Sequence, residues 1–97
     1  MNAFASTPEI EKEKMIGLWF PEWEVLQTES KRRERAEALH RATHLGNLEK
    51  QKVHIYFEDE GGIKKVHTTI WAITERKIIL KAGLSIPIHR IHSVELV

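Results

Sequence analysis

The second half of the chain has the alternating apolar and polar pattern of β-strands. Val53, Ile55 and Phe57 alternate with more polar neighbours, which puts one face of a strand over residues 52–58 against a core. Residues 59–62 end this run with two glycines, which accept the positive φ angles that a tight hairpin turn requires. The pattern therefore predicts a β-hairpin at the start of this half.

Four further strands and a short helical turn are predicted after the first strand. Residues 63–74 are rich in β-branched and aromatic side chains, which favours one long bent strand that serves two parts of a small sheet. Residues 77–81 form the third strand and 84–89 the fourth, where Pro87 lacks an N–H donor and indicates an edge position or a strand end. The alternation of apolar and polar residues shifts after Ile88, and a turn of 3₁₀ helix over 89–92 before a fifth strand would account for this shift. Five antiparallel strands with short turns predict a small, strongly bent barrel.

Two helices are predicted upstream of the strands. Thr7, Pro8 and Glu9 have the capping hydroxyl, first-turn proline and acidic charge of a helix start, and Gly17 would end this short helix. A second helix runs from about Pro21 or Ser30 to Leu45, with Gly46 and Asn47 as a left-handed stop. Its alanines and leucines share one arc and its charges the other, so it is amphipathic.

Three large aromatic residues, Trp19, Phe20 and Trp23, lie between the two predicted helices. Side chains of this size need a partner surface. We expect them to cover an open end of the barrel as part of the core. The alternative is an exposed surface that binds a partner or stacks on nucleic-acid bases, so these residues are also the candidate interaction surface.

Length and composition describe one globular domain. With 97 residues, 41% hydrophobic and 30% charged, we expect a helical and aromatic segment over 1–29 and a basic helix with a small β-barrel over 30–97. The fold class is mostly β with N-terminal α: a five-stranded bent antiparallel barrel preceded by one or two helices. The chain has no cysteine, and neither an apolar leader nor a membrane-spanning run is present, so we expect a cytoplasmic protein.

The net charge of +1 conceals an uneven distribution. Residues 1–30 hold two lysines against six glutamates, whereas residues 31–53 hold seven lysines or arginines against three glutamates. A basic segment of this kind can contact phosphates, so RNA is a candidate partner. The competing interpretation is a solvated helix face, because glutamates interrupt the run. The candidate nucleic-acid-binding residues in this segment are Lys31, Arg32, Arg33, Arg35 and Arg41, with Lys50 and Lys52 further along.

The six histidines raise the question of a metal site. His40 and His44 are four residues apart on one helical face, a spacing that binds zinc when a third ligand converges. No third ligand is identifiable, so we favour a solvated face. We interpret His54 and His67 as cross-strand partners on a solvent face. The sequence therefore predicts no metal and no cofactor.

Catalytic patterns are equally scarce. The chain has no cysteine nucleophile and no glycine-flanked serine, and Gly61 and Gly62 lack the lysine and hydroxyl of a phosphate-binding loop. The acids Glu58, Asp59 and Glu60 crowd a turn where solvent would keep their acidity ordinary. We therefore expect a protein that is not an enzyme.

The order of these elements resembles the Sm-like family of small SH3-like β-barrels, with an Hfq-like layout over about residues 30–97. The resemblance lies in the basic helix, the strand 53–57, the glycine-containing hairpin, the long bent strand and the closing turn 87–91. It implies an RNA-associated barrel in which His89 and Arg90 join the candidate nucleic-acid-binding residues. It also implies a ring-forming homo-oligomer whose subunits pair through edge strands at 85–88 and 93–97.

A second resemblance is to bacterial pleckstrin-homology-like domains. Residues 73–79, which include the turn Thr74-Glu75-Arg76, and the Ile-Pro strand at 86–91 look like late strands of that fold, in which a Thr-x-x-Arg turn precedes an Ile-Pro strand. The short chain favours the smaller barrel. From these features we expect a non-enzymatic RNA-binding module, and the alternative is a protein-interaction or scaffold module that uses Trp19, Phe20, Trp23 and the strand edges.

Overall fold

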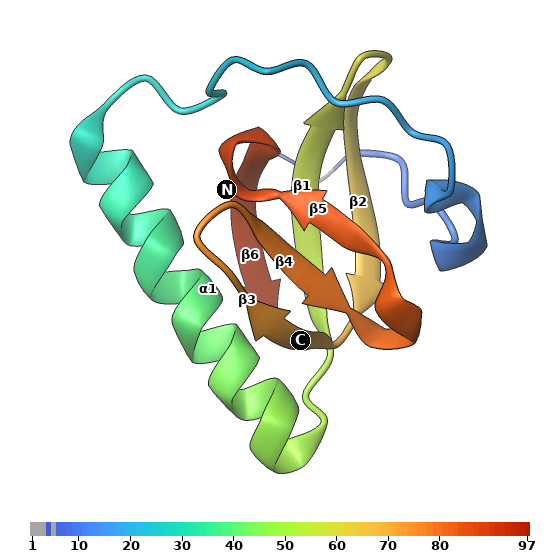
Figure 1. The fold of residues 1–97 in the computed structure, drawn as a ribbon, viewed down its shortest axis with the longest axis vertical. Helices are drawn as coiled ribbons and strands as arrows, with labels where there is room; N and C mark the ends of the chain where they lie inside the picture. The colour runs from blue at the N-terminus through green and yellow to red at the C-terminus, as the bar shows by residue number, and fades with distance from the viewer. Residues whose placement is uncertain (1–3, 5) are drawn as a thin grey trace.

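The computed structural model describes residue 4 and residues 6–97, and its elements follow one another in a simple order (Figure 1). A short 3₁₀ helix precedes a single long α-helix, and six strands follow, interrupted by two more 3₁₀ turns. The elements are η1 (Lys12–Met15), α1 (Glu29–Glu49), β1 (Val53–Asp59), β2 (Gly62–Thr68), β3 (Ile70–Ile73), β4 (Lys77–Leu80), η2 (Lys81–Gly83), β5 (Ser85–Pro87), η3 (Ile88–Arg90) and β6 (Ile91–Leu96). The prediction of a mostly β fold with an N-terminal helix is therefore confirmed.

The strands form two antiparallel three-stranded sheets, with the orders β2-β1-β6 and β3-β4-β5. The five-stranded barrel is not confirmed, because hydrogen bonding among the described residues gives two sheets and no closed barrel. The strand expected over 63–74 is divided at Thr69. The Thr69 carbonyl accepts a hydrogen bond from the Lys81 N–H (3.0 Å), and its hydroxyl donates to the Lys50 carbonyl (3.4 Å). These contacts turn the chain from the first sheet into the second.

Most of the predicted strand pattern is confirmed. The β1–β2 hairpin turns at Glu60 and Gly61, and Gly62, the first residue of β2, has a φ of +127°. β1 pairs residue by residue with β2 from Val53 opposite Thr68 to Asp59 opposite Gly62. β5, which contains Pro87, pairs only with β4 and is an edge strand as expected. The predicted 3₁₀ turn is present as η3, one residue earlier than 89–92.

The helix predicted at Thr7, Pro8 and Glu9 is wrong. Glu9 instead forms a parallel bridge with Lys65 of β2: the Lys65 N–H donates to the Pro8 carbonyl (3.0 Å), and the Ile10 N–H donates to the Lys65 carbonyl (2.9 Å). A helix of two turns has only marginal stability in water. An extended segment can instead form hydrogen bonds with the backbone at the open edge of β2. Only the four residues of η1 are helical in this region.

The long helix has different ends from those predicted. It begins at Glu29, where the Thr28 hydroxyl accepts a hydrogen bond from the Lys31 N–H (3.1 Å), and it continues through Gly46 to a left-handed Lys50 (φ 56°). Gly46 is buried inside the helix, where a Cβ atom would overlap the carbonyl oxygen of Ile70. This glycine therefore permits close helix–strand contact, and Lys50 provides the left-handed cap.

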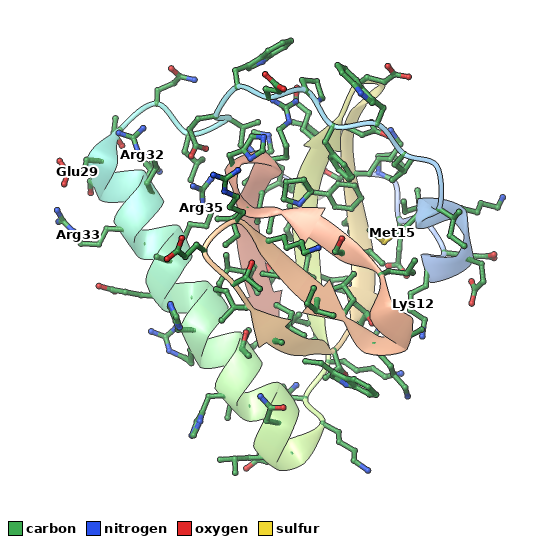
Figure 2. All side chains as sticks on the ribbon, in the orientation of Figure 1. Lys12, Met15, Glu29, Arg32, Arg33 and Arg35 are labelled. Carbon is green, nitrogen blue, oxygen red and sulfur yellow. The ribbon has the colours of Figure 1, made fainter. Side chains whose placement is uncertain are left out.

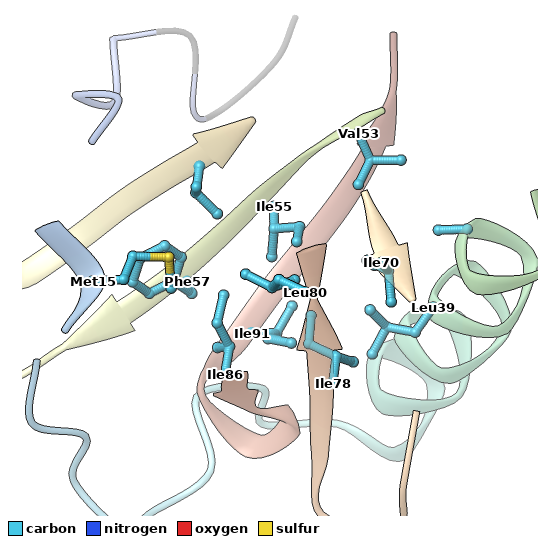
Figure 3. Packing of buried hydrophobic residues seen from close by; sticks show 12 residues of the cluster. Met15, Leu39, Val53, Ile55, Phe57, Ile70, Ile78, Leu80, Ile86 and Ile91 are labelled. Atoms are coloured by element: carbon cyan, nitrogen blue, oxygen red, sulfur yellow. The ribbon is translucent and has the colours of Figure 1, made fainter. Parts of the chain in front are cut away.

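One apolar core holds the helix and both sheets together (Figure 3). Leu39 of α1 lies close to Ile70 and Ile78 of the second sheet, while Met15 of η1 lies beside Phe57 of β1. The full set of buried core residues is Met15, Leu39, Ala42, Val53, Ile55, Phe57, Val66, Ile70, Ile78, Leu80, Ile86 and Ile91. Within the described part of the chain, α1 is too polar to span a bilayer, and no other helix is long enough.

Candidate functional site

The cations of the helix are divided between solvent and the protein interior. Glu29 and Arg33 lie on the outer side of the first turns of α1, Arg32 lies beside the segment that precedes the helix, and Arg35 points toward the strands (Figure 2). Arg33 pairs with Glu29 at 3.4 Å, and both side chains are exposed, so this pair adds little stability. Arg32 donates to the Leu26 carbonyl (2.9 Å). Lys31 and Arg41 are exposed.

Arg35 is buried and belongs to the fold. Its two terminal nitrogens donate to the two carboxylate oxygens of Glu24, each at 2.7 Å, and one also donates to the Ile91 carbonyl (3.0 Å). Burial opposes ionisation of Glu24, but the hydrogen bonds from Arg35 and the Leu26 N–H, together with the charges of Arg35 and Arg32, outweigh it and lower the pKa of the Glu24 carboxyl. Arg35 therefore joins the segment before α1 to β6.

Arg90 and His89 also make internal contacts. The Arg90 side chain, 1% exposed, donates to the carbonyls of Glu58 (3.0 Å) and Trp23 (2.8 Å) and lies 3.7 Å from the Glu58 carboxylate. The His89 ring contacts the Pro21 carbonyl at 3.1 Å. These bonds anchor the segment that crosses the top of Figure 1 from η1 to α1. Of the candidate nucleic-acid-binding residues, Arg35, His89 and Arg90 thus already serve the fold.

The three aromatic residues have different environments. Phe20 is half-buried and packs on Phe57, with ring centroids 6.0 Å apart, as expected for a core residue. Trp19 and Trp23 are 57% and 68% exposed, so the prediction that they cover the core is wrong for them. The Trp19 carbonyl accepts from the Glu60 N–H (3.0 Å), and the Trp23 ring lies 5.6 Å from the Arg90 guanidinium. Backbone contacts fix this segment and leave both indoles in solvent.

A hollow that sequence reasoning missed lies where the end of α1 meets the junction of β2 and β3. We call it the lysine–tryptophan hollow. It has a volume of about 330 Å³ and is lined by Gly46, Asn47, Lys50, Lys52, Thr69, Trp71 and Lys81. Trp71 is 50% exposed, and the three lysines are exposed as well. Among the described residues, none of the three amino groups is in a salt bridge. The hollow therefore combines uncompensated positive charge with an accessible aromatic face.

The local structure explains how the lysines converge. Lys50 caps α1, Lys52 immediately precedes β1, and Lys81 opens η2. The two hydrogen bonds of Thr69, to Lys50 and from Lys81, connect these segments. The sequence singled out Lys50 and Lys52 but treated Trp71 only as a strand residue. The available signal was that Trp71 follows Ile70 in a predicted strand, so the two side chains belong to opposite faces.

The histidines form two separate groups. His40 and His44 are exposed on α1, and no third ligand joins them within the described ranges. His54 and His67 face each other across β1 and β2, with ring centroids 4.7 Å apart, which confirms the predicted cross-strand pair. The carboxylate of Glu9 lies 3.3 Å from His54 Nε2.

The acidic turn is only partly exposed. Asp59, expected in solvent, is buried, and its carboxylate accepts hydrogen bonds from the Lys64 ammonium (2.7 Å) and the Gly61 N–H (2.9 Å). Glu58 is half-buried and contacts His92 Nε2 at 2.8 Å. Asp59 therefore stabilises the hairpin turn.

Comparison with known proteins does not assign the chain to a family. No family model, curated protein or solved structure matches it. The Sm-like and pleckstrin-homology-like resemblances therefore stay predictions. The structure shows a small β-rich domain with one N-terminal α-helix and a lysine-lined hollow at the end of that helix.

Proposed function

We propose that the protein is a non-enzymatic module that binds single-stranded RNA at the lysine–tryptophan hollow. The observation that carries the proposal is the half-exposed Trp71 flanked by Lys50, Lys52 and Lys81. Proteins that bind single strands combine an aromatic face for a base with cations for the backbone, and stacking contributes about 1–3 kcal/mol per base. An indole and three ammonium groups, none of them in a salt bridge with another described residue, supply both parts.

The size and lining of the hollow suit one nucleotide of an RNA strand. A volume of about 330 Å³ lies at the lower end of the range for small-ligand pockets, so it fits one base while the rest of the strand follows the surface. Asn47 adds a side-chain amide to the lining. Lys31, Arg33 and Arg41 of α1 are exposed as well, and they would contribute long-range attraction without holding a base.

Binding of a fluorescently labelled single-stranded RNA, followed by anisotropy across a salt series, tests the proposal. The K50E/K52E/K81E variant should lose at least tenfold in affinity. The log–log salt slope should become shallower by about 2, since each phosphate contact to a single strand contributes roughly 0.7. The matched control is K31E/R33E/R41E, which makes the same change of charge on exposed residues of the helix.

Three outcomes would contradict the proposal. Wild-type affinity could be undetectable at low salt, it could be insensitive to salt, or the helix variant could lose as much affinity as the hollow variant. The last result would assign binding to overall charge or to the basic helix.

The second candidate function is a protein-interaction module. It is favoured by the apolar side chains that the segment from η1 to α1 leaves in solvent, with Ile16 at 76%, Trp19 at 57% and Trp23 at 68% exposure. Aromatic anchors of this kind dominate protein interfaces. A W19A/W23A variant that loses binding to a partner while it keeps RNA affinity would support this candidate, and unchanged partner binding would exclude it.

We also propose that the two sheets are halves of one Sm-like bent barrel. Only Thr69 separates β2 from β3, so the two strands count as a single bent strand and give five in total. β5 and β6 are each at the edge of a sheet, and these edges would pair in a homo-oligomer. Light scattering of the RNA-free protein tests this assembly, and a monomer at high concentration would exclude it.

A further inference from the structure

A second cluster of side chains lies away from the hollow, on the outer face of the first sheet. His54 of β1 and His67 of β2 are direct partners in the strand register, and both belong to the face opposite the buried Val53, Ile55 and Val66. Glu9 of the N-terminal segment lies next to them. One donor atom from each of the three residues lies within 4.8 Å of the other two.

The backbone holds all three residues in place. The two histidines are on adjacent hydrogen-bonded strands, and Glu9 is the residue whose parallel bridge attaches the N-terminal segment to Lys65. The hydrogen bonds on either side of Glu9, from Lys65 to Pro8 and from Ile10 to Lys65, fix its position along β2. Metal ligands carried by such paired strands need little reorganisation on binding.

The ligand chemistry and spacing fit a zinc-class ion. Two imidazoles and one carboxylate form a donor set that zinc uses in proteins, with bonds of about 2.0–2.2 Å. Two donors on a tetrahedral ion with such bonds lie roughly 3.3 Å apart, and the distance from His54 Nε2 to Glu9 Oε1 is 3.3 Å. His67 is exposed, so its ring can rotate to complete the set.

We propose that Glu9, His54 and His67 bind one divalent zinc-class ion, with a fourth position open to water. The ion joins the N-terminal segment to the β1–β2 hairpin, so it stabilises the fold and the attachment of residues 8–10. Glu95, the register partner of His54 on β6, is a second acidic residue on this face, and its carboxylate accepts a hydrogen bond from the Tyr56 hydroxyl (3.3 Å). The sequence pattern paired His54 with His67 but did not add the third ligand, because Glu9 was expected in a helix.

Calorimetric titration of the untagged full chain with Zn²⁺, and visible spectroscopy with Co²⁺, test the proposal. The expected result is one ion per chain, a Co²⁺ spectrum typical of four-coordination and a rise in the melting temperature with Zn²⁺. The H67A and E9Q variants change exposed side chains. They should lower zinc affinity at least tenfold, abolish the rise in melting temperature and leave the metal-free melting temperature close to that of the wild type.

The matched control is H40A/H44A, which removes the other histidine pair. It should leave zinc affinity unchanged. No binding by the wild-type chain, or unchanged affinity in both H67A and E9Q, would overturn the proposal. Loss of affinity only in H40A/H44A would place the ion on α1 and overturn it as well. These readouts do not involve RNA, so they are independent of the proposed function.

Discussion

Two groups of cations in this molecule lie in opposite surroundings. Arg35 and Arg90 are buried and donate to backbone carbonyls, and Arg35 also donates to the Glu24 carboxylate. Lys50, Lys52 and Lys81 instead surround an exposed hollow. The chemistry of the side chains explains the division. A guanidinium offers several donors in a fixed plane and can satisfy multiple acceptors at once, while an ammonium is compact and strongly hydrated. Positive charge therefore stabilises the fold in one region, and in the other it lines the hollow that we propose as the RNA-binding site.

Removal of Arg90 should have the largest effect. R90M leaves the carbonyls of Glu58 and Trp23 without their donor and should lower the free energy of unfolding by about 3–5 kcal/mol, since each hydrogen bond from a charged group contributes about 1.5–3 kcal/mol. Urea denaturation measures it. R33M is the matched control on an exposed arginine and should change stability by less than about 0.5 kcal/mol. Equal effects of the two substitutions would contradict the claim that the buried contacts of Arg90 stabilise the fold.

Replacement of Gly46 should have the next largest effect on stability, because this residue sets the distance between the end of α1 and Ile70. An added Cβ would overlap the Ile70 carbonyl oxygen, so G46A should destabilise the fold by about 1–3 kcal/mol. This loss should exceed the gain of roughly 1 kcal/mol that alanine brings to a helix interior. G46A should also weaken RNA binding, because a helix end pushed away from Ile70 carries Lys50 away from Lys81. Thermal unfolding and anisotropy measure the two effects, and a more stable variant would contradict the close contact.

Loss of the Glu24–Arg35 pair should lower the free energy of unfolding by a smaller amount, and this amount should depend on pH. Because the folded-state pKa of Glu24 is lowered from 4.5, its stabilising contribution is complete above that value and is lost as the pH falls through the folded-state pKa. E24Q should therefore cost about 1–2 kcal/mol near neutral pH, and the difference from wild type should shrink below pH 4.5. Denaturation curves at several pH values measure it. A constant difference down to strongly acidic pH would contradict the assigned ionic contact.

Much of the β-structure could be predicted, because alternation at Val53, Ile55 and Phe57 and the glycines after Asp59 are local signals. The ends of α1 could not, since Gly46 serves a contact with Ile70, which is distant in sequence, rather than a left-handed turn. The division at Thr69 likewise depends on hydrogen bonds to Lys50 and Lys81. Such long-range contacts override local preference.

The candidate sites were harder to predict than the strands. Arg35 belonged to a run of exposed cations in the sequence, and its burial depends on Glu24, eleven residues upstream. The hollow and the histidine–glutamate cluster each combine three segments of the chain. Their residues were visible individually, but only the packing of α1 and the pairing of Glu9 with Lys65 bring them together.

The most direct measurement is the emission of Trp71 alone during titration with single-stranded RNA. A W19F/W23F variant leaves Trp71 as the only one of the three tryptophans. Stacking of a base on this indole should quench its fluorescence to saturation, and added salt should reverse the quenching. Unchanged Trp71 emission at RNA concentrations that saturate anisotropy, with a change instead in a W71F variant that keeps Trp19 and Trp23, would contradict the assignment of the hollow as the RNA-binding site.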